Sequence, residues 1–213
     1  MLDKPNDRRL AKRREATRRE ILDAAWEVAR EQGLAALTLR DVAARVDMRP
    51  PSLYSHFDSK HAIYDAMFGQ AWTECLEVMQ GASDRLRTEL ADGPVAAREQ
   101  LRSFAHAFFD FAVSDLARYQ LMNQHTIHGF APTSGSYAPA IATIEVFRSA
   151  LAHIGVTRDD DIDLATAMIG GLADAQLAND PGGDRWARLV DRAIDMYAAQ
   201  LGLASATSEE DSP

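Results

Sequence analysis

A short helix around residue 54 of this 213-residue chain is predicted to expose hydrogen-bonding side chains, none of which is a carboxylate. In Pro51–Phe57, the apolar residues Leu53 and Phe57 are four apart, which places both on the inner side of a short helix. The side chains that then point outward belong to Ser52, Tyr54, Ser55 and His56. Hydroxyl and imidazole groups both donate and accept hydrogen bonds, so this face suits contact with the base edges of a nucleic acid.

Two short helices joined by a tight turn are predicted for Thr38–Lys60, the segment that must position this face. The first helix begins at Thr38, because Thr38 and Asp41 have the spacing of a capping box. Its apolar stripe consists of Leu39, Val42, Ala43 and Val46. Ala43 is small enough to let two helices cross closely at that point.

A turn at residues 47–50 separates the two helices. Pro51 suits the first position of the second helix, where a missing N–H group costs no hydrogen bond. Pro50 and Pro51 also keep the residues before them out of the helical region. The break between the helices therefore stays open.

The motifs around this turn resemble those of the tetracycline-repressor (TetR) type of one-component transcriptional regulators. The resemblance rests on a helix that ends at Gly33, on Leu37-Thr38-x-Arg40-x-Val42-Ala43, and on Leu53-Tyr54-x-His56-Phe57-x-x-Lys60. Together these stretches cover roughly residues 15–65. The family usually has Gly where this chain has Asp47, and Asp tolerates the left-handed conformation better than most residues.

The resemblance implies an all-α fold, in which an N-terminal three-helix helix-turn-helix DNA-binding domain is followed by a helical bundle for ligand binding and dimerisation. The residues themselves show no strand pattern and no internal repeat. We expect a basic N-terminal arm at 1–14, the DNA-binding domain at 15–59, the effector-binding and dimerisation domain at 60–203 and a disordered acidic tail at 204–213.

Eight residues are expected to contact double-stranded DNA, from the outward face described above and from the matched family positions. Arg40 and Arg49 can donate to guanine O6 and N7 in the major groove. Thr38 and Lys60 lie near helix N-termini and are expected to hold phosphates. The complete predicted set is Thr38, Arg40, Arg49, Ser52, Tyr54, Ser55, His56 and Lys60.

The net charge of −9 is distributed unevenly along the chain. Residues 1–60 carry 13 Lys and Arg against 10 Asp and Glu, whereas residues 61–213 carry 10 against 22. Most of the local basic excess comes from Arg8, Arg9, Lys12, Arg13, Arg14, Arg18 and Arg19. These residues form either a solvated, frayed arm or an arm that follows phosphates or enters a minor groove, and the adjacent motif favours the second interpretation.

Helical spacing predicts seven further helices beside the two of the turn motif. The first is opened by a capping box at Thr17 and Glu20. The predicted bounds are 17–33, 60–80, 94–114, 116–128, 140–154, 159–178 and 184–201, with breaks at Gly81 and residues 92–94 and a loop at 129–139.

One cysteine, Cys75, is present, and no apolar run is long enough to cross a membrane. The charged N-terminus is unlike a signal peptide. We therefore expect a cytoplasmic protein that does not associate with membranes.

Small residues are concentrated in Asp159–Ala178, which contains Gly170 and Gly171, and apolar residues recur at three- and four-residue intervals in Asp184–Leu201. A glycine pair inside a helix costs roughly 1–2 kcal/mol of helix propensity. Packing within the chain is one account of this composition. The family resemblance implies another, a homodimer in which two copies of this helix pair form a four-helix bundle.

Aromatic, Met and His side chains are frequent in the middle helices. They either form a plain core or line a cavity for a small-molecule effector, and helical spacing of aromatic residues by itself favours a core. The resemblance to ligand-responsive regulators adds weight to the cavity. The candidate contacts for a mostly apolar effector are Trp72, Phe104, Phe108, Met122 and His125.

Three histidines, His106, His125 and His128, could in principle converge on a metal ion. No HExxH or carboxylate partner motif accompanies them, and no Gly-rich phosphate loop or GxSxG motif is present. We therefore expect no metal site, no cofactor and no catalytic residue.

The sequence predicts a homodimeric, ligand-responsive transcriptional regulator, a repressor that a small molecule releases from a palindromic operator. One alternative is an architectural DNA-binding protein without an effector, for which the acidic two-thirds of the chain is hard to justify. Another is a small-molecule-processing enzyme that carries an inactive DNA-binding head. Such an enzyme would show no sequence-selective DNA binding.

Overall fold

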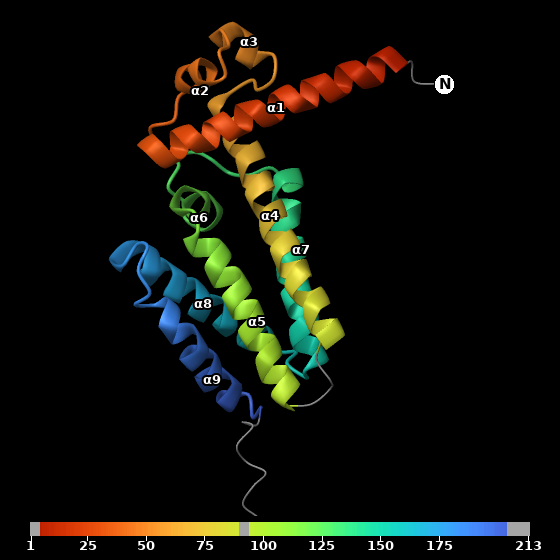
Figure 1. The fold of residues 1–213 in the computed structure, drawn as a ribbon, viewed down its shortest axis with the longest axis vertical. Coiled ribbons are helices and arrows are strands. Elements are labelled where there is room, and N and C mark those ends of the chain that lie inside the picture. Colours follow the sequence, from red (N-terminus) through yellow and green to blue (C-terminus); the bar gives the residue numbers. More distant parts are fainter. Residues whose placement is uncertain (1–4, 90–93, 204–213) are drawn as a thin grey trace, which may run out of the picture. The chain divides into compact units, whose positions relative to one another are not determined.

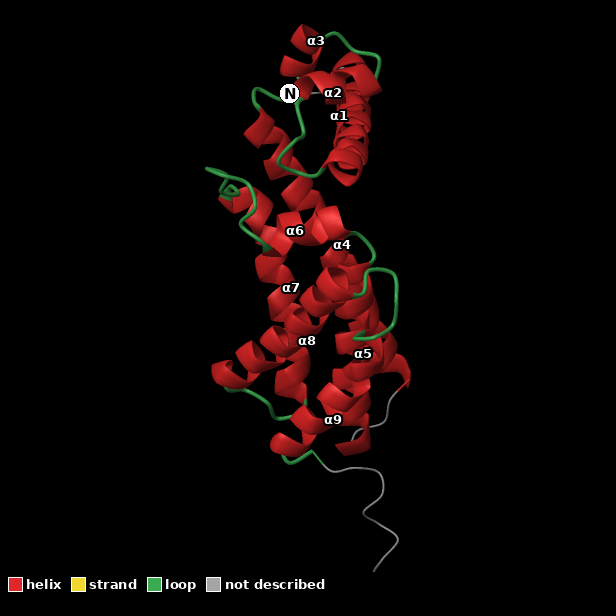
Figure 2. Cartoon of the chain, turned by 90° about the vertical axis from the view of Figure 1, so that its left-hand side faces the viewer, coloured by secondary structure: helices red, strands yellow, loops and turns green. Residues whose placement is uncertain are grey.

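A computed structural model describes residues 5–89 and 94–203 of the chain. Its helices are α1 (Pro5–Gln32), α2 (Leu39–Arg45), α3 (Pro50–Tyr54), α4 (Lys60–Glu89), α5 (Pro94–Val113), α6 (Leu116–Asn123), α7 (Ser134–His153), α8 (Asp159–Asn179), a 3₁₀-helix (Ala187–Leu189) and α9 (Val190–Gln200) (Figure 1). Figure 2 shows only helices and loops in this described part, which confirms the predicted all-α fold. None of these helices is both long and apolar enough to cross a membrane.

Parts of three predicted segments lie outside the described residues. They are residues 1–4 of the basic arm, residues 92–93 of the predicted break and the acidic tail at 204–213.

The chain forms two compact units. The expected division into functional domains at residue 60 stays a prediction. The first unit combines Met1–Ala71 with Ala117–Ala138, and the second combines Trp72–Leu116 with Pro139–Pro213. Helix α4 contributes its first part to the first unit and its remainder to the second. Helical periodicity marks where a helix lies along the chain, but it does not reveal which unit the helix packs into.

The first unit is built around the apolar side of α1. Ile21, Ala25 and Val28 are at most 1% exposed, as their helical spacing predicted. The other large side chains that are almost fully buried in this unit are Leu37, Leu53, Phe57, Ile63, Tyr64 and Met67. This core fixes α2 and α3 against α1.

Helix α1 begins at Pro5, well before its predicted start at Thr17. Thr17 does not cap the helix, because its hydroxyl donates a hydrogen bond to the Arg13 carbonyl at 3.1 Å. Residues 8–16 are mainly Arg, Lys, Ala and Glu, whose strong helix propensity outweighs the capping signal. The described part of the predicted arm, residues 5–14, is therefore helical.

The second unit has a core in which α5 packs against α8 and α9. Its most deeply buried large side chains include those of Leu101, Phe104, Phe109, Leu151, Ile162 and Ile194. Arg102 donates to the Asp195 carboxylate at 2.9 Å, and the His106 Nε2 atom lies 2.8 Å from the Asp191 carboxylate. These polar contacts join α5 to α9.

Several helix ends differ from the prediction. Helix α4 continues through Gly81 to Glu89, because one glycine costs only about 1 kcal/mol of helix propensity and does not stop a long helix. Helix α6 ends at Asn123 rather than His128, and the predicted last helix is divided into the 3₁₀-helix and α9.

Helix α7 begins at Ser134, inside the predicted loop at 129–139. The Thr133 hydroxyl accepts a hydrogen bond from the Ser136 N–H at 3.3 Å, which is the contact of a helix N-cap. Pro139 lies within the first turns of α7 and does not prevent the helix from forming. The cap at Thr133 outweighs the loop composition of the segment.

Candidate nucleic-acid interface

The start of α2 is fixed by Thr38 and Asp41. The Thr38 hydroxyl accepts a hydrogen bond from the Asp41 N–H at 3.2 Å and donates one to the Asp41 carboxylate at 2.5 Å. Thr38 is therefore the N-cap of α2, as predicted. Val42 and Ala43 are fully buried, so Arg40, which is exposed, lies on the outer side of this helix.

The turn between α2 and α3 depends on a left-handed residue. Asp47 has a φ of 51°, and no other non-glycine residue in the described ranges has a positive φ. The Met48 N–H donates to the Ala43 carbonyl at 2.8 Å and so satisfies a carbonyl group at the end of α2. The left-handed conformation expected at position 47 is confirmed.

Helix α3 begins with Pro50 and Pro51, so Pro50 rather than Pro51 is its first residue. The absent N–H groups of these prolines cost no hydrogen bond, because the first N–H groups of a helix have no partner inside it. Leu53 and Phe57 are 0% and 1% exposed, which confirms their inner position, whereas Tyr54 is 52% exposed. The outer side of α3 is thus open to a binding partner.

All eight predicted DNA-contacting residues lie in the first unit. The six that are exposed are Thr38, Arg40, Arg49, Ser52, Tyr54 and Ser55. His56 is half-buried, and its Nδ1 atom makes no hydrogen bond within the described residues. Lys60 donates to the Ala35 carbonyl at 3.0 Å, which leaves two of its three ammonium protons for another acceptor.

Two arginines of α1 hold the end of α3, a role that the sequence reasoning missed. Arg14 donates to the Ser55 carbonyl at 3.1 Å, and Arg18 donates to the His56 carbonyl. The Arg18 guanidinium also lies 4.0 Å from the centroid of the Phe57 ring, a cation–π contact. The signal for this role is their i, i+4 spacing, which places both on one side of α1.

Arg45 ties the end of α2 to α1 through ion pairs with Glu27, at 2.9 Å, and with Glu31. Hydrogen bonding from Arg45 lowers the pKa of Glu31, and the same contacts raise the pKa of Arg45. The pairs are open to solvent, so their contribution to stability is small. Their effect is on orientation, because they hold α2 at a fixed angle to α1.

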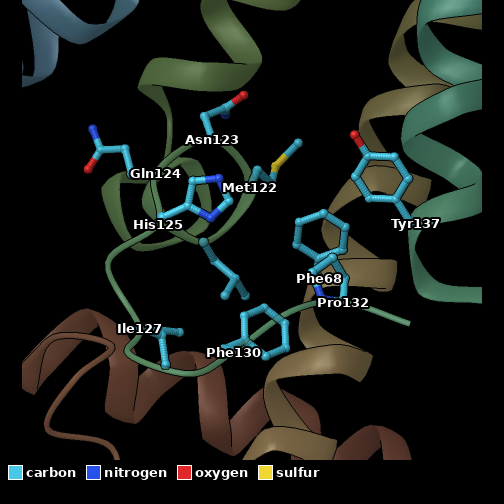
Figure 3. Close-up of a pocket in the computed structure, with 10 residues that line it drawn as sticks. Phe68, Met122, Asn123, Gln124, His125, Ile127, Phe130, Pro132 and Tyr137 are labelled. Atoms are coloured by element: carbon cyan, nitrogen blue, oxygen red, sulfur yellow. The ribbon is translucent and has the colours of Figure 1, made fainter. Parts of the chain in front are cut away.

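A pocket of about 180 Å³ also lies in the first unit. It is lined by Phe68, Leu121, Met122, Asn123, Gln124, His125, Ile127, Phe130, Pro132 and Tyr137. Figure 3 shows the amides of Asn123 and Gln124 on the side of His125, and the rings of Phe68 and Tyr137 on the other side. The pocket is therefore apolar at one end and polar at the other.

Two of the five predicted effector contacts, Met122 and His125, line this pocket. The other three, Trp72, Phe104 and Phe108, belong to the second unit. Phe104 is 2% exposed and lies edge-on to Phe147, with 5.8 Å between the ring centroids, which is a core contact. The aromatic, Met and His content of the middle helices suggested all five, but it did not show how they are divided between the two units.

An aromatic cluster joins α4 to the residues around the pocket. Phe130 lies 5.8 Å from Tyr64 and 6.4 Å from Phe68, measured between ring centroids. Phe68 in turn stacks on Tyr137 at 6.0 Å. Phe130 and Tyr137 follow no helical period with α4, so no local sequence pattern indicates that they meet its rings.

The three histidines considered as metal ligands are not brought together. His106 pairs with Asp191 in the second unit, whereas His125 and His128 lie in the first. Among the described residues, no group of three His, Cys, Asp or Glu side chains is arranged to hold a metal ion.

The model of the family "Bacterial regulatory proteins, tetR family" matches residues 21–67. Among named relatives, the transcriptional activator FasR of Mycolicibacterium smegmatis is 32% identical over 109 residues, which cover 51% of this chain and 46% of FasR. The transcriptional repressor KstR2 of Rhodococcus jostii is 33% identical over 116 residues, 52% of each protein. The chain spans about half the length of the curated relatives that it matches.

Solved structures share the fold over most of the chain. The putative regulatory protein SCO4313 covers 88% of this chain and 97% of its own, with a TM-score of 0.72 and 22% identity. The transcriptional regulator FadR of Bacillus subtilis, solved with stearoyl-CoA, covers 84% of this chain and 97% of its own, with a TM-score of 0.67 and 16% identity. At such identities the likeness concerns the fold alone.

The cap at Thr38, the left-handed Asp47 and the buried Leu53 and Phe57 all fall within the matched residues. Over these residues, 21–67, the chain matches the model of the tetR family of bacterial regulatory proteins.

Proposed function

We propose that this protein is a ligand-responsive DNA-binding transcriptional regulator, a repressor that a small molecule releases from a palindromic operator. This proposal rests on the two sides of α3, one apolar and buried and the other polar and exposed. Leu53 and Phe57 are buried, whereas Ser52, Tyr54 and Ser55 are exposed, hydrogen-bonding and without a neighbouring carboxylate on the helix. Such a face matches the donor and acceptor pattern of the DNA major groove.

The proposed division of labour follows the position of each side chain. Tyr54, Ser52 and Ser55 would contact base edges together with His56, and Arg40 and Arg49 would donate to guanine. Thr38 and Lys60 would hold phosphates at the two helix N-termini, Lys60 with the protons that Ala35 does not accept.

A homodimer through Asp159–Ala178 and Asp184–Leu201 is the proposed assembly. A Cβ atom built on Gly170 or Gly171 would meet nothing within 4 Å, so packing within the chain does not explain this glycine pair. Leu164 is 53% exposed on α8 and Met196 is 66% exposed on α9. Burial of these side chains against a second copy would offset the low helix propensity of the glycines.

The proposed effector site is the pocket that Met122 and His125 line. Its volume of about 180 Å³ is close to that of a roughly 150 Å³ protein cavity that binds benzene, which favours a small, single-ring ligand. Phe68 and Phe130 would contact the ring, and the Asn123 amide and His125 imidazole would bind a polar substituent. The roles of Trp72, Phe104 and Phe108 in effector binding remain predictions.

The proposed mechanism is a change in the separation of the two recognition helices of a dimer. Two copies of α3 must lie roughly 34–36 Å apart to enter successive major grooves, and an effector that favours another spacing releases the operator. An effector that binds the DNA-incompetent form 100-fold more tightly shifts the balance by about 2.7 kcal/mol. This proposal makes the protein a regulator and not an enzyme, in line with its relatives.

Selection of bound fragments from the source genome tests the proposed function. We expect a small set of fragments that share an inverted repeat, with half-sites one helical turn apart. The genes beside them would then suggest effector candidates, whose addition should release the labelled fragment. Recovery of fragments without a common motif would refute the proposal of a sequence-selective regulator.

A further inference from the structure

The N-terminal part of α1 carries a concentration of positive charge that lies outside the set of predicted DNA-contacting residues. Residues 5–19 contain seven Lys and Arg against two acidic residues. Figure 1 shows this part of α1 continuing past α2 and α3 toward the N-terminus. It is a helix and not an extended arm.

Two of these arginines fix the segment to the recognition helix. Arg14 and Arg18 donate to the carbonyls of Ser55 and His56, which directly follow α3. These contacts hold the basic helix and the outer face of α3 in one arrangement. Whatever α3 contacts will therefore have this helix beside it.

The remaining five basic side chains point elsewhere. These five side chains are exposed and make no ion pair or hydrogen bond with the described residues. They belong to Arg8, Arg9, Lys12, Arg13 and Arg19. At 100° per residue, Arg8, Lys12 and Arg19 share one line along the helix, about 120° around from the side that holds α3. Unpaired like charges this close together repel one another, which costs stability unless an anionic partner compensates.

We propose that residues 8–19 of α1 form a second DNA-binding surface, which lies along the phosphates that flank the site read by α3 and is independent of base sequence. This inference rests on the proposed DNA binding by α3. From Arg8 to Arg19 the helix rises about 16 Å, which matches the rise of roughly five base pairs.

The size of the helix decides how it meets DNA. An α-helix with its side chains is roughly 10–12 Å in diameter, whereas the minor groove of B-DNA is about 6 Å wide. The segment therefore cannot enter that groove, as an extended arm can. Contact with the phosphate backbone remains, and Lys and Arg side chains make it by releasing counterions.

DNA fits this surface better than an anionic membrane does. A helix that lies on a membrane buries an apolar stripe, and Leu10 is the only large apolar residue between residues 8 and 19. The two contacts with the end of α3 place the charge beside the predicted base-reading residues.

The salt dependence of DNA binding tests the proposal. The test variant is Arg8→Gln with Lys12→Gln, which removes two charges and keeps helix propensity. The matched control is Arg85→Gln with Arg158→Gln, two exposed arginines of the second unit that lie outside the proposed dimer segments and give the same change in net charge. The probes are a random-sequence duplex and a fragment from the genomic selection, and circular dichroism checks that helix content is retained.

With the proposed surface, each lost phosphate contact reduces the slope of log affinity against log salt by about 0.9, so the test variant should lose about 1.8 for each protomer bound, or about 3.6 for the proposed dimer. Its affinity deficit relative to the wild type then changes about tenfold per protomer, or about 100-fold for the dimer, between roughly 50 and 200 mM salt. The control should keep the wild-type slope. The preference for the selected fragment over the random duplex should be the same in all three proteins.

Equal slopes for test and control variants would overturn the proposal, as would a changed preference between the two duplexes, which would mean that the helix reads bases. If the test variant instead loses binding to phosphatidylglycerol vesicles and keeps its DNA slope, the partner is a membrane. A slope loss on the random duplex supports the basic surface even if the genomic selection yields no motif. In that case the basic DNA-binding surface would stand although the proposed regulator function had failed.

Discussion

The Asp65 carboxylate on α4 accepts a hydrogen bond from the Thr133 N–H at 2.7 Å, just before α7 begins. The same carboxylate accepts from the Thr133 hydroxyl at 3.0 Å and from the Ser136 hydroxyl at 2.7 Å. A negative charge is favourable at a helix N-terminus, so Asp65 both caps α7 and fixes the end of the loop that lines the pocket.

Replacing Asp65 by Asn should therefore destabilise the protein. Hydrogen bonds to a charged group contribute more than neutral ones, so we expect a loss of about 1–2 kcal/mol in the free energy of unfolding, measured by urea denaturation. Asp110→Asn removes an exposed carboxylate of α5 and serves as the control. If both variants unfold at the same urea concentration, the cap contributes nothing.

Tyr54→Ala should weaken operator binding by about 1–3 kcal/mol without reducing the stability of the protein, because this side chain is 52% exposed. Fluorescence anisotropy with a labelled operator measures the first effect, and thermal unfolding checks the second. Tyr137→Ala is the matched control, since Tyr137 is 47% exposed and lies in the pocket wall. If Tyr54→Ala binds the operator with wild-type affinity, the Tyr54 side chain does not contact the operator.

Gly171→Leu should weaken the proposed dimer while each chain remains folded. The added side chain meets no atom of its own chain within 4 Å of its Cβ, and it raises helix propensity. Against a closely packed second copy it should cost about 1–3 kcal/mol of association free energy. Light scattering at micromolar concentration decides the matter, with the exposed Ala152→Leu on α7 as the control. A monomeric wild type would contradict the dimer itself.

His125→Ala should weaken the binding of a small aromatic effector about two- to tenfold, since a hydrogen bond contributes about 0.5–1.5 kcal/mol net. Operator affinity without effector should stay unchanged, because His125 lies in the loop after α6 and not in α2 or α3. His128→Ala, three residues further along, leaves the pocket lining intact and is the control. Isothermal titration measures both variants, and equal affinities would exclude this pocket as the effector site.

Two buried tyrosines should make the protein lose stability in strong alkali. Burial raises the pKa of Tyr64 to about 12, and burial with the nearby Asp161 carboxylate raises the pKa of Tyr197 to about 12, both from 10.0. A pKa raised by folding means that the folded state holds its proton more tightly. The stabilising contribution is therefore complete below about pH 10 and is lost as the pH rises toward 12.

Unfolding midpoints measured between pH 9 and 12 check this dependence. Tyr64→Phe keeps the ring and removes the hydroxyl that donates to the Leu34 carbonyl. This variant should be less stable than the wild type at neutral pH and should show a shallower decline in alkali. An identical decline would mean that Tyr64 does not titrate in this range.

The helix-turn-helix was predictable because its signals are local. Thr38 and Asp41 are three residues apart, and the prolines at 50 and 51 act on their immediate neighbours. Leu53 and Phe57 needed only the helical period to be placed inside. Each of these features depends on a few consecutive residues, for which propensity and capping rules hold.

The pocket could not be predicted in the same way, because its residues meet only in the tertiary structure. Phe68 precedes Phe130 by some sixty residues, and their rings lie 6.4 Å apart between centroids. The contact of Arg14 with the Ser55 carbonyl spans 41 residues of sequence and uses a backbone acceptor, which every residue offers. Composition cannot select one such acceptor among many.

The left-handed Asp47 has a consequence for how this chain can diverge from its relatives. Asp in this conformation bears a strain of roughly 1 kcal/mol that Gly would relieve. Gly would also give the unfolded chain more freedom, which disfavours folding by about 0.4–1 kcal/mol. The two effects nearly cancel, so neither residue is selected for stability. Position 47 can drift between Asp and Gly over generations while the turn keeps its shape.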